Sequence, residues 1–249
     1  MTYHIYGIGA ALVDTEIDVS DQDLAQLDIT KGHMTLVDAE RQQQLVDYLA
    51  GHMTHSKRAS GGSAANSIIA ASYFGAKTFY SCKVAQDDNG SFYLKDMQAA
   101  GVACNTYENV GDGATGKCLV LITPDAERTM LTNLGISETL CKQALNHDAV
   151  ARSQFAYIEG YLVTSPTGRA AAIELREAAE KHGVKTALSL SDPGMVEFFG
   201  DGLREMLGNG VDLLFCNEHE AQGFTATDNT AAAAEKLKHY AKTFAITCG

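Results

Sequence analysis

Tryptophan is absent from this chain of 249 residues, proline occurs only three times, and basic residues are scarce beside acidic ones. Nineteen Lys and Arg against 31 Asp and Glu give a formal net charge of -12, which repels phosphate backbones and anionic membranes over the whole surface. We therefore expect no nucleic-acid partner. An anionic substrate is still compatible with this charge, because a few local N–H groups or cations can bind a phosphate on an acidic protein.

The chain also lacks long apolar runs and a basic, apolar start. No uncharged apolar run approaches the ~20 residues of a membrane span, and the N-terminal stretch meets Asp14, Glu16 and Asp18 at once, unlike a secretory signal. We expect no membrane contact and a cytoplasmic protein. The cysteines form no C-x-x-C pair, which favours buried thiols in a reducing compartment over a metal site; they are Cys82, Cys104, Cys118, Cys141, Cys216 and Cys248.

Short apolar segments alternate with helical ones along most of the sequence, and neither solenoid repeats nor low-complexity segments interrupt them. Strands separated by helices require right-handed crossovers, so we expect an α/β fold with a doubly wound, mostly parallel sheet and helices on both faces. The alternation breaks once, where two β-prone runs, 115–123 and 128–134, flank Pro124-Asp125-Ala126-Glu127. A proline that presets the first turn dihedral predicts a hairpin there.

Parallel sheets bind ligands beyond the carboxyl ends of their strands. The first strand, 3–8, ends at Gly7-Ile8-Gly9, but Leu12 occupies the third glycine position of a dinucleotide fingerprint, which argues against that motif. Asp14 follows in an otherwise apolar stretch and could accept hydrogen bonds from two sugar hydroxyls. By spacing alone, a solvated loop acid is the better interpretation of Asp14.

Residues 60–66 read Ser-Gly-Gly-Ser-Ala-Ala-Asn. Paired glycines let the backbone approach a ligand, small residues leave space above a helix start, and Asn66 offers a donor and an acceptor in the first turn. A glycine-rich helix cap explains the stretch equally well. It is not a Walker loop, because no G-K-[ST] follows.

Asn217-Glu218-His219-Glu220 begins just beyond another apolar strand. Asn217 and Glu220 fall on one face of a starting helix, where an amide and a carboxylate can hold a hydrated Mg²⁺ through its waters. Acids that complement the helix dipole are the alternative. That alternative accounts for the glutamates but not for the position of Asn217.

Taken together and in this order, these segments resemble the PfkB (ribokinase-like) family of carbohydrate and nucleoside kinases over essentially the whole chain. The most specific part is Gly61-Gly62-Ser63-Ala64-Ala65-Asn66 followed by Lys83-Val84-Ala85-Gln86-Asp87-Asp88-Asn89-Gly90, which looks like the family's N-terminal signature. Residues 217–220 match its N-x-x-E element. Ser63, where a lysine is common in ribokinases, and the segments 115–118 and 123–129 place the chain closest to the adenosine-kinase-like branch.

The resemblance implies a ribokinase-like core, residues 1–12, 36–103 and 135–249, with a small β-sheet lid, residues 13–35 and 104–134. It implies ATP-dependent phosphotransfer, with Mg²⁺, to a hydroxymethyl group of a sugar or nucleoside. Lid edges of this kind can pair between subunits, which allows a homodimer. By the same resemblance Asp14, Gly61, Gly62 and Asn66 bind substrate, with Glu159 and Arg128 as additional contacts; Asn217, Glu220, Thr247 and Gly249 bind the nucleotide, with Glu220 as the metal residue.

The family's second signature, D-T-x-G-A-G-D, carries the catalytic aspartate and should follow Thr247-Cys248-Gly249, where the sequence stops. We expect residues 1–249 to be a fragment of a longer enzyme that binds substrate but turns over poorly, with its catalytic aspartate beyond Gly249. The alternative from another class is a non-catalytic sugar- or nucleoside-binding protein of the same fold. Both the kinase and the binding protein require Asp14 and Asn66 to lie close together beneath the lid.

Overall fold

The computed structural model describes residues 3–52, 57–105 and 110–248. A seven-stranded sheet, in which every neighbouring pair is parallel, runs through the larger part of the molecule in the order β14-β13-β12-β11-β1-β5-β7. Its strands are β1 (Tyr3–Ile8), β5 (Thr78–Ser81), β7 (Val102–Cys104), β11 (Ser153–Glu159), β12 (Lys185–Ser189), β13 (Val211–Asn217) and β14 (Ala241–Thr247). The expected parallel α/β sheet is confirmed.

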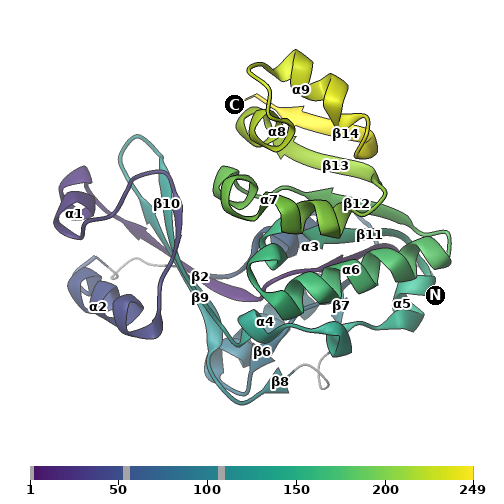
Figure 1. Cartoon of the computed structure of the whole chain (residues 1–249). Helices are drawn as coiled ribbons and strands as arrows, with labels where there is room; N and C mark the ends of the chain where they lie inside the picture. The colour runs from purple at the N-terminus through teal and green to yellow at the C-terminus, as the bar shows by residue number, and fades with distance from the viewer. Residues whose placement is uncertain (1–2, 53–56, 106–109, 249) are drawn as a thin grey trace.

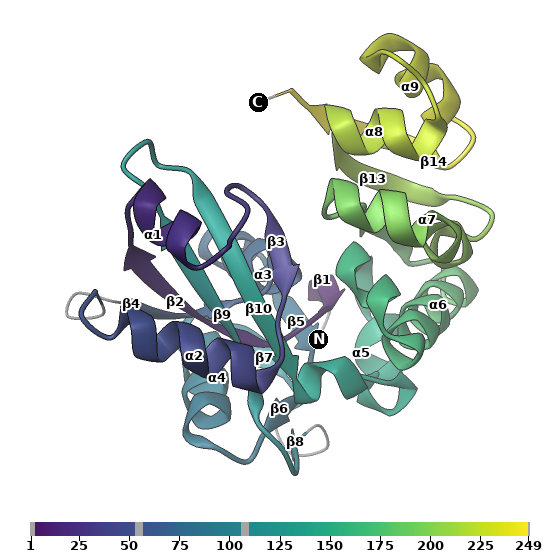
Figure 2. The same ribbon diagram turned by 60° about the vertical axis from the view of Figure 1, so that its left-hand side comes forward.

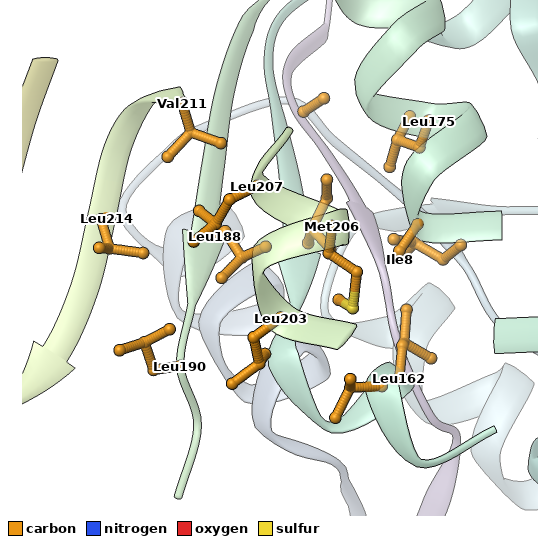
Figure 3. Close-up of a cluster of buried hydrophobic side chains, with 14 of the residues drawn as sticks. Ile8, Leu162, Leu175, Leu188, Leu190, Leu203, Met206, Leu207, Val211 and Leu214 are labelled. Carbon is orange, nitrogen blue, oxygen red and sulfur yellow. The ribbon is translucent and has the colours of Figure 1, made fainter. Parts of the chain in front are cut away.

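Helices cover both faces of this sheet, as the alternating pattern predicted. On one face α3 (Ser63–Tyr73) and α4 (Asp88–Ala99) pack through Ile68, Tyr93 and Met97. The other face carries α5 (His147–Ala151), α6 (Pro166–Lys181), α7 (Pro193–Leu207), α8 (Glu218–Thr225) and α9 (Thr230–Leu237). Figure 3 shows part of this second core, in which Leu203 and Leu207 of α7 lie against side chains from the strands. No helix in the described ranges is long and apolar enough to cross a membrane.

A second, five-stranded sheet forms a lid beside the carboxyl edge of the first (Figure 1). Its order is β3-β10-β9-β2-β4, with β2 (Leu12–Asp18), β3 (Met34–Leu36), β4 (Lys57–Gly61), β9 (Thr115–Ile122) and β10 (Arg128–Gly135). The expected hairpin is confirmed, because β9 and β10 pair antiparallel across the proline turn.

One face of the lid is covered by α1 (Asp21–Gln26) and α2 (Ala39–Leu49), which lie side by side in Figure 2. Leu24, Leu45 and Leu49 from these helices bury against Leu119 and Leu121 of β9. The lid therefore has its own hydrophobic core, and the edge strands of its sheet are β3 and β4.

The observed boundary between core and lid differs from the division expected from sequence. Residues 36–61 were assigned to the core, yet α2 packs on the lid and β4 pairs with β2. Residues 104–114 were expected in the lid, yet Cys104 is the last residue of β7 in the parallel sheet and the short β8 (Val110–Gly111) pairs with β6 (Val84–Ala85). The 3-10 turns η2 (Ile136–Thr139), η3 (Lys142–Ala144) and η4 (Gly160–Thr164) complete the chain.

Candidate active site

A cavity of about 270 Å³ lies between the lid and the carboxyl ends of β1, β11 and β12. Its floor is polar and comes from the parallel sheet and the start of α3, whereas its roof is mostly apolar and comes from the lid. The lining residues are Ala10, Leu12, Asp14, Met34, Leu36, Gly62, Ser63, Asn66, Cys118, Arg128, Met130, Thr132, Leu134, Glu159, Tyr161, Thr164 and Ser191. Asp14 and Asn66 thus share one cavity, as the sequence analysis required.

Asp14 reaches this cavity from β2, the first lid strand. One carboxylate oxygen, Oδ1, is buried and has no hydrogen-bond partner in the described part of the protein. Burial raises the pKa of Asp14 from 3.8 to about 6; the positive charge of Arg128 opposes this rise and the negative charge of Glu16 adds to it. An unpartnered carboxylate at a cavity wall is ready to accept hydrogen bonds from a polar ligand.

Gly61 and Gly62 give Asp14 its space. A Cβ at Gly61 would lie 2.0 Å from Asp14 Oδ1, so only glycine fits beside that carboxylate. Gly62 adopts a φ of 101°, and a Cβ there would lie 2.5 Å from the carbonyl oxygen of Ala10. Both glycines are therefore dictated by close packing, and they bring the start of α3, with Asn66 in its first turn, against the cavity.

Glu159, at the end of β11, is buried beneath the same cavity. Its Oε2 accepts the N–H of Ala10 at 2.7 Å, and its Oε1 accepts the N–H of Ala64 at 2.9 Å and the hydroxyl of Ser63 at 3.0 Å. Burial raises the pKa of Glu159, and these hydrogen bonds counteract the rise. Both carboxylate oxygens thus already bind the protein, holding the chain after β1 to the start of α3.

The surface that the roof presents to the cavity consists mainly of aliphatic carbon and sulfur atoms. Leu12, Met130 and Leu134 line it together with Cys118, whose thiol accepts a hydrogen bond from Thr132 at 3.4 Å. Burial raises the pKa of the Cys118 thiol to about 12, so this cysteine is no nucleophile at neutral pH. The roof is suited to a flat apolar group rather than to a further set of hydroxyls.

Arg128 is the cation among the residues that line the cavity. It lies on the lid and is half exposed, and its guanidinium is 3.9 Å from the carboxylate of Glu16. At that distance and exposure the ion pair is weak. Arg128 can therefore leave Glu16 at little cost to meet a negatively charged ligand.

Asn217 and Glu220 lie outside the cavity lining, at the end of β13. They form a capping box: the N–H of Glu220 donates to Asn217 Oδ1 at 2.8 Å, and Asn217 donates its backbone N–H and its side-chain amide to the two oxygens of Glu220 at 3.0 and 2.8 Å. Burial raises the pKa of Glu220; the hydrogen bond from Asn217 opposes this rise and the charge of Asp192 adds to it. The structure thus shows the helix cap that was the alternative interpretation. The cap also holds the Glu220 carboxylate at the carboxyl edge of the parallel sheet.

Thr247 is exposed at the end of β14 and pairs in register with Asn217. Gly249, expected beside it, lies outside the described residues. In the described ranges no group of three or more His, Cys, Asp or Glu side chains could enclose a metal ion. The oxygen donors of Asn217 and Glu220, with Asp192 nearby, fit a Mg²⁺ ion held through water rather than by a protein cage.

Sequence reasoning did not single out several cavity residues. Tyr161, Thr164 and Ser191 follow β11 and β12, and Ser191 has a φ of 75°, unusual for a residue other than glycine. The general expectation of a ligand beyond the strand ends did not identify these three side chains. Met34 and Leu36 come from β3, which has only three residues and is too short for a sequence pattern to identify.

Comparison with known proteins places this geometry among sugar and nucleoside kinases. The model of the pfkB family carbohydrate kinase matches residues 23–249. Adenosine kinase of Saccharomyces cerevisiae is 30% identical over 232 residues, which cover 90% of this chain and 66% of the yeast protein. The solved structure of adenosine kinase from Sinorhizobium meliloti superposes with a TM-score of 0.93 at 33% identity, over 100% of this chain and 75% of that one. A probable sugar kinase from Rhizobium etli gives 0.93 at 31% identity, over 100% and 74%. The chain spans about two thirds of the length of the curated adenosine kinases it matches.

Proposed function

The chain belongs to the pfkB family of carbohydrate kinases, and from that premise we propose that it serves ATP-dependent phosphoryl transfer to the primary hydroxyl of a nucleoside. The observation that carries the proposal is the unpartnered, buried oxygen of Asp14 in a cavity that Asn66 also lines. A ribose offers adjacent hydroxyl donors for such a carboxylate and an acceptor for the Asn66 amide. Hydrogen bonds from a bound ribose would stabilise the charged form of the Asp14 carboxylate, which burial disfavours in the free protein.

A nucleoside suits the cavity better than a free sugar does. The polar floor accounts for hydroxyl recognition, but a sugar alone would leave the apolar roof of Leu12, Met130 and Leu134 unused. A purine or pyrimidine base has apolar faces of the kind that such a roof buries favourably. The 33% identity with an adenosine kinase of nearly identical fold supports the same class of substrate.

Phosphoryl transfer depends on positioning and on neutralising charge, with little covalent work for the protein. In this proposal Asp14 and Asn66 orient the ribose, the lid excludes water, and Arg128 exchanges Glu16 for the negatively charged phosphate. Asn217, Glu220 and Thr247 lie at the neighbouring strand ends and would hold the nucleotide, with Glu220 holding Mg²⁺ through water. Mg²⁺, when bound, neutralises negative charge on the phosphates.

Isothermal titration tests the proposal directly. We expect adenosine to bind the chain at least tenfold more tightly than ribose, because only adenosine fills the roof, and Asp14→Asn to weaken adenosine ~10- to 100-fold. The appearance of AMP from ATP and adenosine would demonstrate phosphoryl transfer and so identify a kinase rather than a binding protein. A chain that binds neither adenosine nor any other nucleoside, or that prefers free ribose, would refute a nucleoside site.

A further inference from the structure

Within the described residues, the chain passes between the parallel sheet and the lid at four places. Residues 9–11 lead into β2, Gly62 leads out of β4, Ala114 leads into β9, and residues 136–137 lead out of β10. In Figure 1 the neighbouring strands β2, β9 and β10 run from the lid towards the core. Any change in the angle of the lid must be absorbed at these crossings, because both sheets are held internally by their ladders.

The first crossing is held by side chains instead of by a β-ladder. The N–H of Ala10 donates to Glu159 Oε2 at 2.7 Å, and the carbonyl of Ala10 accepts from the Tyr80 hydroxyl at 2.9 Å. The N–H of Ala11 donates to Ser137 Oγ at 3.1 Å, and the carbonyl of Ala11 lies 3.0 Å from the same oxygen. Buried side chains from three other elements thus fix the backbone of Ala10 and Ala11, through which the chain passes from the core into β2.

Ser137 lies on the last of these crossings and hydrogen-bonds to the first. Its buried hydroxyl lies on η2, directly after β10, and also stands 3.1 Å from the carbonyl of Lys83 in the core. A hydroxyl has one hydrogen, so it can donate to the carbonyl of Ala11 or to that of Lys83, but not to both at once. The N–H of the neighbouring Ile136 donates to the carbonyl of Ala114 at 2.8 Å. This bond connects the chain after β10 to the chain that leads into β9.

We propose that Ser137 is a positioning residue for Asp14. Its hydroxyl joins the chain before β2 to the chain after β10, and this link sets the position of the Asp14 carboxylate over the cavity. Asp14 is three residues beyond Ala11 on β2, and the space beside its carboxylate is so narrow that Gly61 cannot carry a Cβ. A binding group must be held within about 0.5 Å of its productive position. Loss of the Ser137 bonds therefore misplaces Asp14 without touching any group that contacts the ligand.

The inference rests on the proposed nucleoside site, and its test compares two buried serines. Ser137→Ala removes the hydroxyl at the crossings, whereas Ser153→Ala removes a buried hydroxyl that donates to the carbonyl of Ala149 at 2.7 Å, far from the lid. Both variants lose a buried hydrogen bond and some stability. We expect Ser137→Ala to raise the adenosine Kd about tenfold, at a temperature where both variants are fully folded, and Ser153→Ala to leave it within twofold.

Two further measurements distinguish a role of Ser137 in positioning Asp14 from a general loss of protein stability. The Kd for Mg-ADP should stay within twofold in Ser137→Ala, because Asn217 and Glu220 lie at another strand end. Hydrogen exchange should accelerate in the β2 amides of Ser137→Ala and not in those of β11. If Ser137→Ala fails to fold, Tyr80→Phe removes one hydroxyl from the same crossing and should show the same pattern, faster exchange in β2 and weaker adenosine binding.

The outcomes distinguish this inference from the proposed function. Wild-type protein that binds no nucleoside would remove the proposed function, and with it the role of Ser137 in placing a substrate group. Wild-type protein that binds adenosine, with unchanged affinity and unchanged β2 exchange in Ser137→Ala, would overturn the inference alone. An equal loss of adenosine affinity in Ser137→Ala and Ser153→Ala would also overturn it.

Discussion

Lowering the pH should weaken nucleoside binding through Asp14 alone. Burial raises the pKa of Asp14 to about 6, and hydroxyl donors from a bound ribose favour its charged form. Binding must then lower this pKa and release a proton, so affinity falls as the pH drops below about 6 and is level above about 7. The affinity follows the ionised fraction of free Asp14, which is roughly nine tenths at pH 7 and roughly one tenth at pH 5.

The expected change between about pH 8 and about pH 5 is therefore a tenfold loss of affinity, equivalent to about 1.4 kcal/mol. Isothermal titration of adenosine at constant ionic strength measures it. The charges that act on Asp14 are those of Arg128, which lowers its pKa, and Glu16, which raises it. Arg128→Ala should consequently move the midpoint to higher pH, by a small amount because the arginine is half exposed.

Asp14→Asn provides the control, because the amide keeps the size of the side chain and cannot ionise. Its weaker adenosine affinity should be level over the whole range. Wild-type affinity that stays within twofold down to about pH 5, or the same slope in wild type and Asp14→Asn, would refute the reasoning. The second result would assign the titration to another buried acid such as Glu159, whose pKa burial also raises.

Two substitutions probe the remaining geometry. Gly61→Ala places a methyl group 2.0 Å from Asp14 Oδ1, so calorimetry should show adenosine affinity reduced ~100-fold, whereas Gly51→Ala, where a Cβ meets nothing within 4 Å, should leave it unchanged. Glu220→Gln removes the charge that would hold Mg²⁺ and disturbs the capping box; we expect about 1 kcal/mol lower stability in urea titration and ~10-fold weaker Mg-ATP, with adenosine affinity retained because Glu220 lies outside the cavity lining. Equal losses for Gly51→Ala and Gly61→Ala, or a loss of adenosine binding in Glu220→Gln, would contradict these expectations.

The parallel core was predictable because its signals are local. Asn217 was expected at the start of a helix after an apolar strand, and its side chain accepts the N–H of Glu220 at the start of α8. The lid strand β4 was missed because its sequence, Lys-Arg-Ala-Ser-Gly, is mostly polar, and β2, Leu-Val-Asp-Thr-Glu-Ile-Asp, was expected in the lid only through the family resemblance. They become strands by pairing with each other across 40 residues or so, a non-local gain that no short window reveals.

The candidate site divides in the same way. Residue type and position drew attention to Asp14 and Asn66, the family resemblance made them substrate-binding candidates, and both line the cavity. Ser137 carried no signal, because a serine three residues after a hairpin is ordinary until the fold brings Ala11 and Lys83 to its hydroxyl. Residue chemistry can nominate groups that meet a ligand, but groups that orient other groups emerge only from tertiary neighbours.

The separate hydrophobic core of the lid has a consequence for the order in which the protein unfolds. Leu24, Leu45, Leu119 and Leu121 gain their burial from one another and not from the parallel sheet, so a block built around them can come undone while the sheet stays intact. Heating should then produce a first, smaller melting step that a nucleoside shifts upward and a second that it leaves in place. A destabilising substitution in the lid core, remote from the ligand, should therefore lower substrate affinity under conditions in which the parallel core is still folded.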